Sequence, residues 1–96
     1  KAVYIIYNQS LTEGVQDILD KLSIKGYTQW TGITGRGSVN GEPHHGTHTW
    51  PELNNAHLTI IDDSKVDALL NKLESFNKSV EEQGLRAFVW DIVNMV

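Results

Sequence analysis

A polar stretch between residues 35 and 55 holds three of the four histidines of the chain. His44, His45 and His48 offer imidazole nitrogens, and Glu42 offers a carboxylate. Neutral imidazole is the commonest ligand of transition metals in proteins, and this set of donors suits Zn, Ni or Cu(II). The spacing matches no established metal motif, and an intervening glycine disfavours a helix that would present two of the histidines together. The stretch therefore predicts a divalent-metal site, with surface histidines that only hydrogen-bond within the loop as the alternative.

The same stretch opens with an arginine between two glycines, Gly35, Arg36 and Gly37. Glycine permits positive φ and a close approach of the backbone, so that main-chain amides can point at an anion. The guanidinium of Arg36 adds a planar fork suited to phosphate or carboxylate. The tripeptide predicts a site for an anionic ligand, and a flexible hinge with a solvated arginine is the alternative.

The end of the stretch places a large aromatic side chain, Trp50, in polar surroundings. Pro51 pushes the residue before it into an extended conformation. The apolar surface of Trp50 favours docking on this chain or on a neighbouring subunit. Because binding residues concentrate on such loops, Trp50, Glu52 and Asn54 are predicted to dock the loop on a partner.

Composition excludes several classes of protein. The chain has 96 residues, a net charge of −4 and no cysteine. A negative chain does not suit general binding of nucleic acid, which needs clustered Lys and Arg. No apolar run approaches the ~20 residues of a membrane span, so we expect no direct membrane insertion. The lack of cysteine removes thiolate catalysis and zinc-thiolate sites, and it is compatible with the cytoplasm, where we expect the protein.

No arrangement typical of catalysis stands out in the sequence. The chain has neither a serine elbow nor a carboxylate pair with evident spacing. A small enzyme that uses His44, His45 or His48 as a base is the weakest functional hypothesis, and we expect no enzymatic activity. His57 lies in a predicted strand and is expected to be a hydrogen-bonded histidine of the sheet rather than a ligand.

Hydrophobic patterning predicts four strands and two helices in the order β-α-β-β-α-β. The predicted strands cover residues 2–8, 27–33, 55–63 and 85–96. Helices follow the first and third strands. Capping boxes are predicted at Ser10 with Glu13 and at Ser64 with Asp67, and a helix stop at Gly26.

This order predicts an α+β ferredoxin-like βαββαβ sandwich that forms one domain over residues 1–96. A four-stranded antiparallel sheet would carry both helices on one face. The strands are apolar on both faces, so the uncovered face favours packing against another copy of the chain. Residues 34–54 become a long loop between the second and third strands, and loops beyond ~12–15 residues are usually functional or disordered.

These features resemble the PII signalling proteins, and more closely their PII-like branch. The resemblance rests on the βαββαβ order, on TGRGSVNGEPHHGTHTWPELNNA at residues 34–56 and on EQGLRAFVWDIVNMV at residues 82–96. It implies a non-catalytic homotrimer that senses adenine nucleotides in clefts between subunits, with Gly35, Arg36 and Gly37 beside the cleft. It also implies that the long loop changes conformation with ligand and regulates a partner transporter or enzyme.

The chain departs from the PII pattern just before its last strand. PII proteins carry there a second glycine-rich loop with a lysine that holds nucleotide phosphates, whereas VEEQGLRAF has one glycine, Gly84, and no lysine. Arg86 is the cation nearest to this position. A triphosphate would keep much of its charge unpaired, so the departure argues against ATP sensing. The leading hypothesis is therefore a PII-like regulator that binds a small ligand or metal ion, and the alternative is a CutA-like protein that binds divalent metals.

Overall fold

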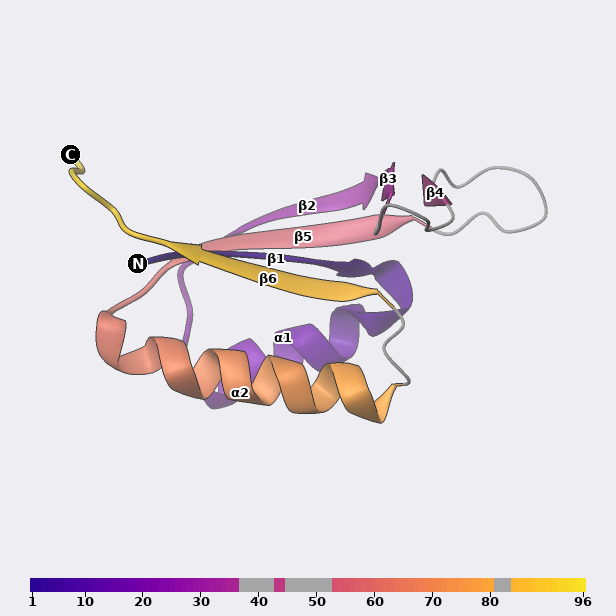
Figure 1. The fold of residues 1–96 in the computed structure, drawn as a ribbon, viewed down its shortest axis with the longest axis horizontal. Coiled ribbons are helices and arrows are strands. Elements are labelled where there is room, and N and C mark those ends of the chain that lie inside the picture. Colours follow the sequence, from indigo (N-terminus) through magenta and orange to yellow (C-terminus); the bar gives the residue numbers. More distant parts are fainter. Residues whose placement is uncertain (37–42, 45–52, 81–83) are drawn as a thin grey trace.

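The computed structural model describes residues 1–36, 43–44, 53–80 and 84–96, and it describes residues 35–36 and 43–44 by their backbone alone. Within these ranges the chain forms a four-stranded antiparallel sheet in the order β2-β5-β1-β6. Both helices cover one face of this sheet (Figure 1). The predicted ferredoxin-like βαββαβ sandwich is thereby confirmed.

The elements of the sandwich are the strands β1 (Ala2–Asn8), β2 (Thr28–Ile33), β5 (Asn54–Ile60) and β6 (Leu85–Trp90) and the helices α1 (Thr12–Lys21) and α2 (Asp63–Ser79). A 3₁₀ turn, η1 (Gln9–Leu11), precedes α1. Two short strands, β3 (Gly35–Arg36) and β4 (Pro43–His44), pair with each other outside the main sheet.

The core lies between the helices and one face of the sheet. Val3, Ile5 and Tyr7 alternate along β1 and are fully buried on that face. They join the apolar stripes of the two helices, which contribute the buried residues Val15, Ile18, Leu19, Leu69 and Leu73. The predicted helix faces therefore follow the 3.6-residue period that the sequence shows.

The other face of the sheet carries exposed aromatic side chains. Trp30, Phe88 and Trp90 are 43%, 53% and 48% exposed, respectively. The ring of Tyr4 lies 6.4 Å from that of Trp30, measured between centroids. In the part of the chain that the structure describes, no helix covers this side of the sheet (Figure 1), and we refer to it below as the open face.

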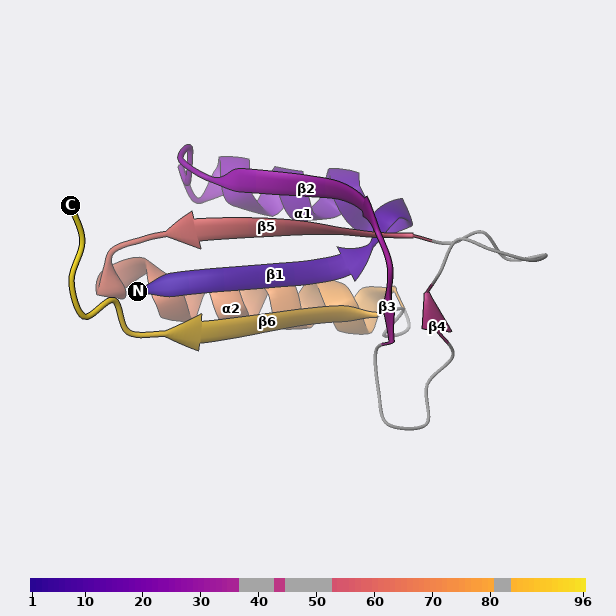
Figure 2. The ribbon, with the colours of Figure 1, turned by 90° about the horizontal axis from the view of Figure 1, so that it is seen from above.

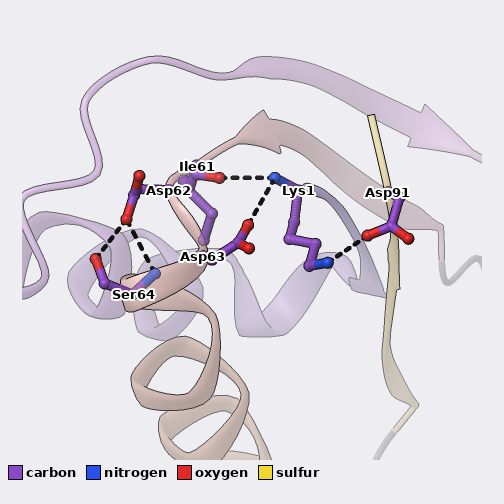
Figure 3. Close-up of polar contacts among 6 residues, drawn as sticks. All are labelled: Lys1, Ile61, Asp62, Asp63, Ser64 and Asp91. Atoms are coloured by element: carbon purple, nitrogen blue, oxygen red, sulfur yellow. Dashed lines mark hydrogen bonds and ion pairs between the residues drawn. The ribbon is translucent and has the colours of Figure 1, made fainter. Parts of the chain in front are cut away.

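Both predicted capping boxes are wrong. At α1 the side chain of Asn8 accepts a hydrogen bond from the Ser10 amide at 2.9 Å, so the chain enters the helix through η1. At α2 the carboxylate of Asp62 accepts from the Ser64 amide at 3.0 Å (Figure 3). In both places the amide of the serine donates to the side-chain oxygen of the residue two positions before it. Asn and Asp are among the residues preferred for this capping role.

The predicted helix stop at Gly26 is also wrong. Helix α1 ends at Lys21, and Ser23 takes the left-handed conformation with φ of 57°. The Ser23 amide donates to the Asp20 carbonyl at 3.0 Å, which closes the helix before Gly26 is reached. A serine therefore occupies the position at which helices favour glycine.

The last strand is shorter than predicted. Strand β6 ends at Trp90, whose partner on β1 is Ala2. Residues 91–96 extend past this pair, and Val93 and Met95 are exposed. Among the helices of the described ranges, none has both the length and the apolar character needed to span a membrane.

Candidate functional site: the loop end of the sheet

One end of the sheet brings together the segments that carry the predicted ligand-binding residues. Strands β1 and β2 end there, and β5 and β6 begin there (Figure 2). Asn8 pairs with Asn54, and its amide donates to the Gly84 carbonyl at 3.1 Å. On the other side of β5, Ile33 also pairs with Asn54. We refer to this region as the loop end.

The two sides of the long loop are tied to this end by main-chain bonds. The Gln9 amide donates to the Leu53 carbonyl at 2.8 Å, which fixes the exit of the loop to η1. At the entry, Gly32 has φ of +65° and lies within an irregularity of the pairing between β2 and β5. The loop thus leaves and rejoins the sheet beside the start of α1.

The side chain of Asn55 joins three parts of the loop end. Its Oδ1 accepts from the Gly32 amide at 2.9 Å, and its Nδ2 donates to Thr12 Oγ1 at 2.8 Å. Thr12 in turn donates from its hydroxyl to the Gln9 carbonyl at 2.6 Å. The sequence reasoning missed Asn55 and Thr12 as residues that shape the site. The asparagine pair at the start of β5 was the available signal, but nothing in it identifies the distant partners of Asn55.

The predicted anion-binding tripeptide begins at this end. Gly35 pairs with His44 and Arg36 with Pro43, so β3 and β4 form a small antiparallel pair beyond the main sheet. Figures 1 and 2 show this pair beyond the end of the sheet at which β6 begins. The backbone at residues 35–36 and 43–44 is extended. Gly37 lies outside the described residues.

Arg86 is the predicted ligand-binding residue on β6. It pairs with Ile6 of β1 and follows Gly84 by two residues in the chain. Its side chain is exposed. Its Nη1 donates to the carbonyl of the adjacent Leu85 at 3.2 Å. Among the described side chains it forms no ion pair.

Asn54 is the one predicted docking residue whose side chain the structure describes. It is only 7% exposed, and its Oδ1 has no hydrogen-bond partner within the described part of the chain. A buried acceptor of this kind ordinarily has a partner. Trp50 and Glu52, the other predicted docking residues, lie outside the described ranges.

The predicted metal site falls mostly outside the described residues. Glu42, His45 and His48 are not described, and His44 is described by its backbone in β4. Within residues 1–36, 43–44, 53–80 and 84–96, no group of three or more His, Cys, Asp or Glu side chains is arranged to hold a metal ion.

His57 is buried in the middle of β5 and is hydrogen-bonded, as expected for a sheet histidine. Its Nδ1 lies 2.8 Å from the Tyr7 hydroxyl, and its Nε2 lies 3.4 Å from Gln16 Oε1. Burial lowers the pKa of His57 and raises the pKa of Tyr7.

Comparison with solved structures identifies relatives of the fold. CPII, a nitrogen regulatory PII-like protein from Thiomonas intermedia K12, was solved with ADP and bicarbonate. It matches with a TM-score of 0.73 at 25% identity, over 95% of this chain and 83% of that chain. A second CPII structure, with ADP, AMP and bicarbonate, matches with a TM-score of 0.72 at 24% identity, over 95% and 87% of the two chains. A PII-like signalling protein from Thermus thermophilus has a TM-score of 0.62 at 20% identity, over 91% and 80%.

Of the two sequence comparisons, one agrees with this likeness at the level of the family. No curated protein matches the chain. The family model for the nitrogen regulatory protein P-II matches residues 1–96. The match spans both the loop end and the two-helix layer. The chain therefore belongs to the nitrogen regulatory protein P-II family.

Proposed function

We propose that this protein is a non-catalytic PII-like regulator that binds an adenine nucleotide at the loop end of the sheet. The observation that carries the proposal is the convergence of Gly35–Arg36, Asn54 and Gly84–Arg86 at one end of the sheet. Membership of a regulatory family and the likeness to CPII, which was solved with ADP, AMP and bicarbonate, support the choice of ligand.

The charges at the loop end favour a nucleotide with fewer phosphates than ATP. Arg36 and Arg86 are the chain's two arginines, and both belong to this region. Arginine binds phosphate or carboxylate through a planar fork, and two such groups can match the charge of a mono- or diphosphate. ADP and AMP are therefore the proposed ligands, and bicarbonate is a proposed second anion.

We further propose that the protein works as a cytoplasmic homotrimer whose ligand clefts lie between subunits. The open face supports this assembly, because Trp30, Ile60, Phe88 and Trp90 are each between 43% and 53% exposed. Contiguous exposed aromatic side chains of this kind mark protein–protein interfaces. The long loop, residues 34–54, would contact a regulated transporter or enzyme and change that contact with ligand.

Calorimetric titration of the full chain with ADP, AMP and ATP, each with and without bicarbonate, tests the proposal. We expect ADP or AMP to bind more tightly than ATP. Arg86→Ala should weaken ADP binding by roughly tenfold or more, the effect of losing one charge-assisted contact. Lys72→Ala removes an exposed cation from α2 and should leave binding unchanged.

Three results would contradict parts of the proposal. If ADP is converted to another compound during the titration, the protein is catalytic. A monomer in native mass spectra would remove the trimer and its clefts. If the chain ignores nucleotides but takes up Zn²⁺, and if His44→Ala, His45→Ala and His48→Ala together abolish that uptake, the CutA-like alternative replaces nucleotide sensing.

A further inference from the structure

The pairing of β2 with β5 contains one residue too many. Trp30 pairs with Ala56 and Ile33 with Asn54, so β2 advances three residues while β5 advances two. Gly32 lies in this interval with φ of +65°. An extra residue of this kind is a β-bulge, and its main-chain groups have no partner in the ladder. The Gly32 amide therefore needs an acceptor from elsewhere.

Asn55 supplies that acceptor from within β5. Its Oδ1 accepts from the Gly32 amide at 2.9 Å, while Nδ2 donates to Thr12 Oγ1 at 2.8 Å. The residue is only 7% exposed, so water does not readily replace either bond. One buried carboxamide thus fixes the bulge at the loop entry against the first residue of α1.

The bulge lies just before the segment that carries the proposed anion-binding arginine. Gly35 is three residues after Gly32, and the backbone turns away from the strand direction between them (Figure 2). Bulges bend a strand and re-aim the residues that follow, which is why they are common beside functional sites. The direction in which Gly35–Arg36 leaves the sheet therefore depends on whether the bulge is held.

We propose that Asn55 is a positioning residue for the ligand site. By holding the bulge at Gly32, it sets the path of Gly35–Arg36 at the loop end. It acts through the backbone and need not touch the ligand. A carboxamide suits the position because it offers one acceptor and one donor together, which neither a carboxylate nor a hydroxyl of this length provides in the same way.

The expected effect of Asn55 on ligand affinity rests on the proposed function, whereas its effect on the bulge at Gly32 does not. The test therefore has two readouts on the full chain: NMR hydrogen exchange of the amides of residues 32–36, and calorimetric affinity for ADP. Asn55→Ala removes both bonds. Asn55→Asp keeps an acceptor oxygen for the Gly32 amide and lacks the donor. Leu69→Val, a buried change on α2, controls for a general loss of stability.

We expect Asn55→Ala to speed exchange at Gly32 by about tenfold or more, the equivalent of losing one hydrogen bond. Asn55→Asp should keep the Gly32 amide protected, and Leu69→Val should change all amides alike. ADP affinity should fall in Asn55→Ala well beyond any fall in Leu69→Val.

Two outcomes overturn the inference. If the Gly32 amide exchanges at the same rate in Asn55→Ala as in Leu69→Val, the bulge does not depend on Asn55. Fast exchange with unchanged ADP affinity would show that the path of Gly35–Arg36 does not depend on the bulge. If the unmodified chain does not bind ADP, the proposed function fails, and the exchange readout alone decides whether Asn55 holds the bulge.

Discussion

The two ends of the sheet are held by different chemistry. At the loop end the buried asparagines of the described residues make neutral hydrogen bonds, and Asn8, Asn54 and Asn55 are each no more than 7% exposed. At the opposite end, charged groups lie at the surface. There the main-chain nitrogen of Lys1 donates to the Ile61 carbonyl at 2.8 Å, and the Lys1 side chain forms an ion pair with Asp91 (Figure 3).

This difference matters because the two kinds of contact respond differently to change. Exposed ion pairs contribute little and weaken with salt, since water and ions screen them. Buried neutral hydrogen bonds are insensitive to salt, but a partner left unsatisfied costs free energy. The end that is proposed to bind ligand is thus the end whose geometry tolerates the least substitution.

The largest effect is expected from Thr12→Val, which removes a hydroxyl of the loop end without changing the size of the side chain much. The hydroxyl accepts from Asn55 Nδ2 at 2.8 Å and donates to the Gln9 carbonyl at 2.6 Å. Leaving these groups unpaired should lower the free energy of unfolding by about 1–3 kcal/mol, measured by urea titration. Thr12→Ser keeps the hydroxyl and should recover most of the loss. If Thr12→Val and Thr12→Ser are equally stable, the loop end is not held by this hydroxyl.

A second comparison uses two residues with positive φ, one near each end of the sheet. Gly32 has φ of +65° at the loop end, and Ser23 has φ of 57° near the opposite end. A side chain in this conformation costs roughly 1–2 kcal/mol relative to glycine. Gly32→Ala should therefore destabilise the protein by about that amount, although the nearest atom to an added Cβ, on Leu53, is 3.7 Å away.

Ser23→Gly should have the opposite sign, with a gain of up to ~1 kcal/mol, because glycine removes the backbone strain but adds freedom to the unfolded chain. Thermal unfolding of the two variants side by side measures both signs. A gain in stability from Gly32→Ala would mean that the bulge does not need its left-handed residue.

The third prediction concerns pH and His57, the buried histidine in the middle of β5. Burial lowers the pKa of His57, so between its folded value and the unfolded value of ~6.5 the unfolded chain binds more protons. The free energy of unfolding should therefore be highest above pH ~6.5 and should fall as the pH drops through that value to the folded pKa.

His57→Gln should be less stable at neutral pH and should lose this dependence. Subtracting the two urea-unfolding profiles removes the contribution of the loop histidines, which are the same in both proteins. Parallel profiles would show that the His57 imidazole does not titrate differently in the folded chain.

The fold could be predicted because its signals are local and repeated. The alternation of Val3, Ile5 and Tyr7 with Tyr4 and Ile6 specifies a strand with two apolar faces, and the structure covers one of them with helices. The caps could not be predicted as well, because Asn8, Ser10, Asp62 and Ser64 all suit a cap. The end of β6 was misplaced for a different reason: it depends on the register with β1, which pairs Trp90 with Ala2, and the sequence pattern does not show that register.

The candidate site was predictable only in part. Glycines around Arg36 marked the place where the loop leaves the sheet, and the structure places Gly35–Arg36 beyond the end of β2. Asn55 was missed because its two partners, Thr12 and Gly32, are 43 and 23 residues away in the sequence. A hydrogen bond over such a distance leaves no periodic pattern, and only the register of the sheet reveals that an amide needs it.

The smallest effect is expected from Asp91→Asn at the charged end. The Asp91 side chain is 74% exposed, so its ion pair with Lys1 is screened by water and salt. The hydrogen bond from Lys1 lowers the pKa of Asp91, so any stabilisation is present above the unfolded value of 3.8 and is lost as the pH falls through the folded pKa. At neutral pH and about 0.15 M salt, Asp91→Asn should change the thermal midpoint little, and added salt should remove what remains. A loss of stability as large as that of Thr12→Val would show that exposed charged contacts stabilise this sheet as strongly as buried hydrogen bonds do. The contrast between the two ends would then no longer explain why ligand binding is proposed for one of them.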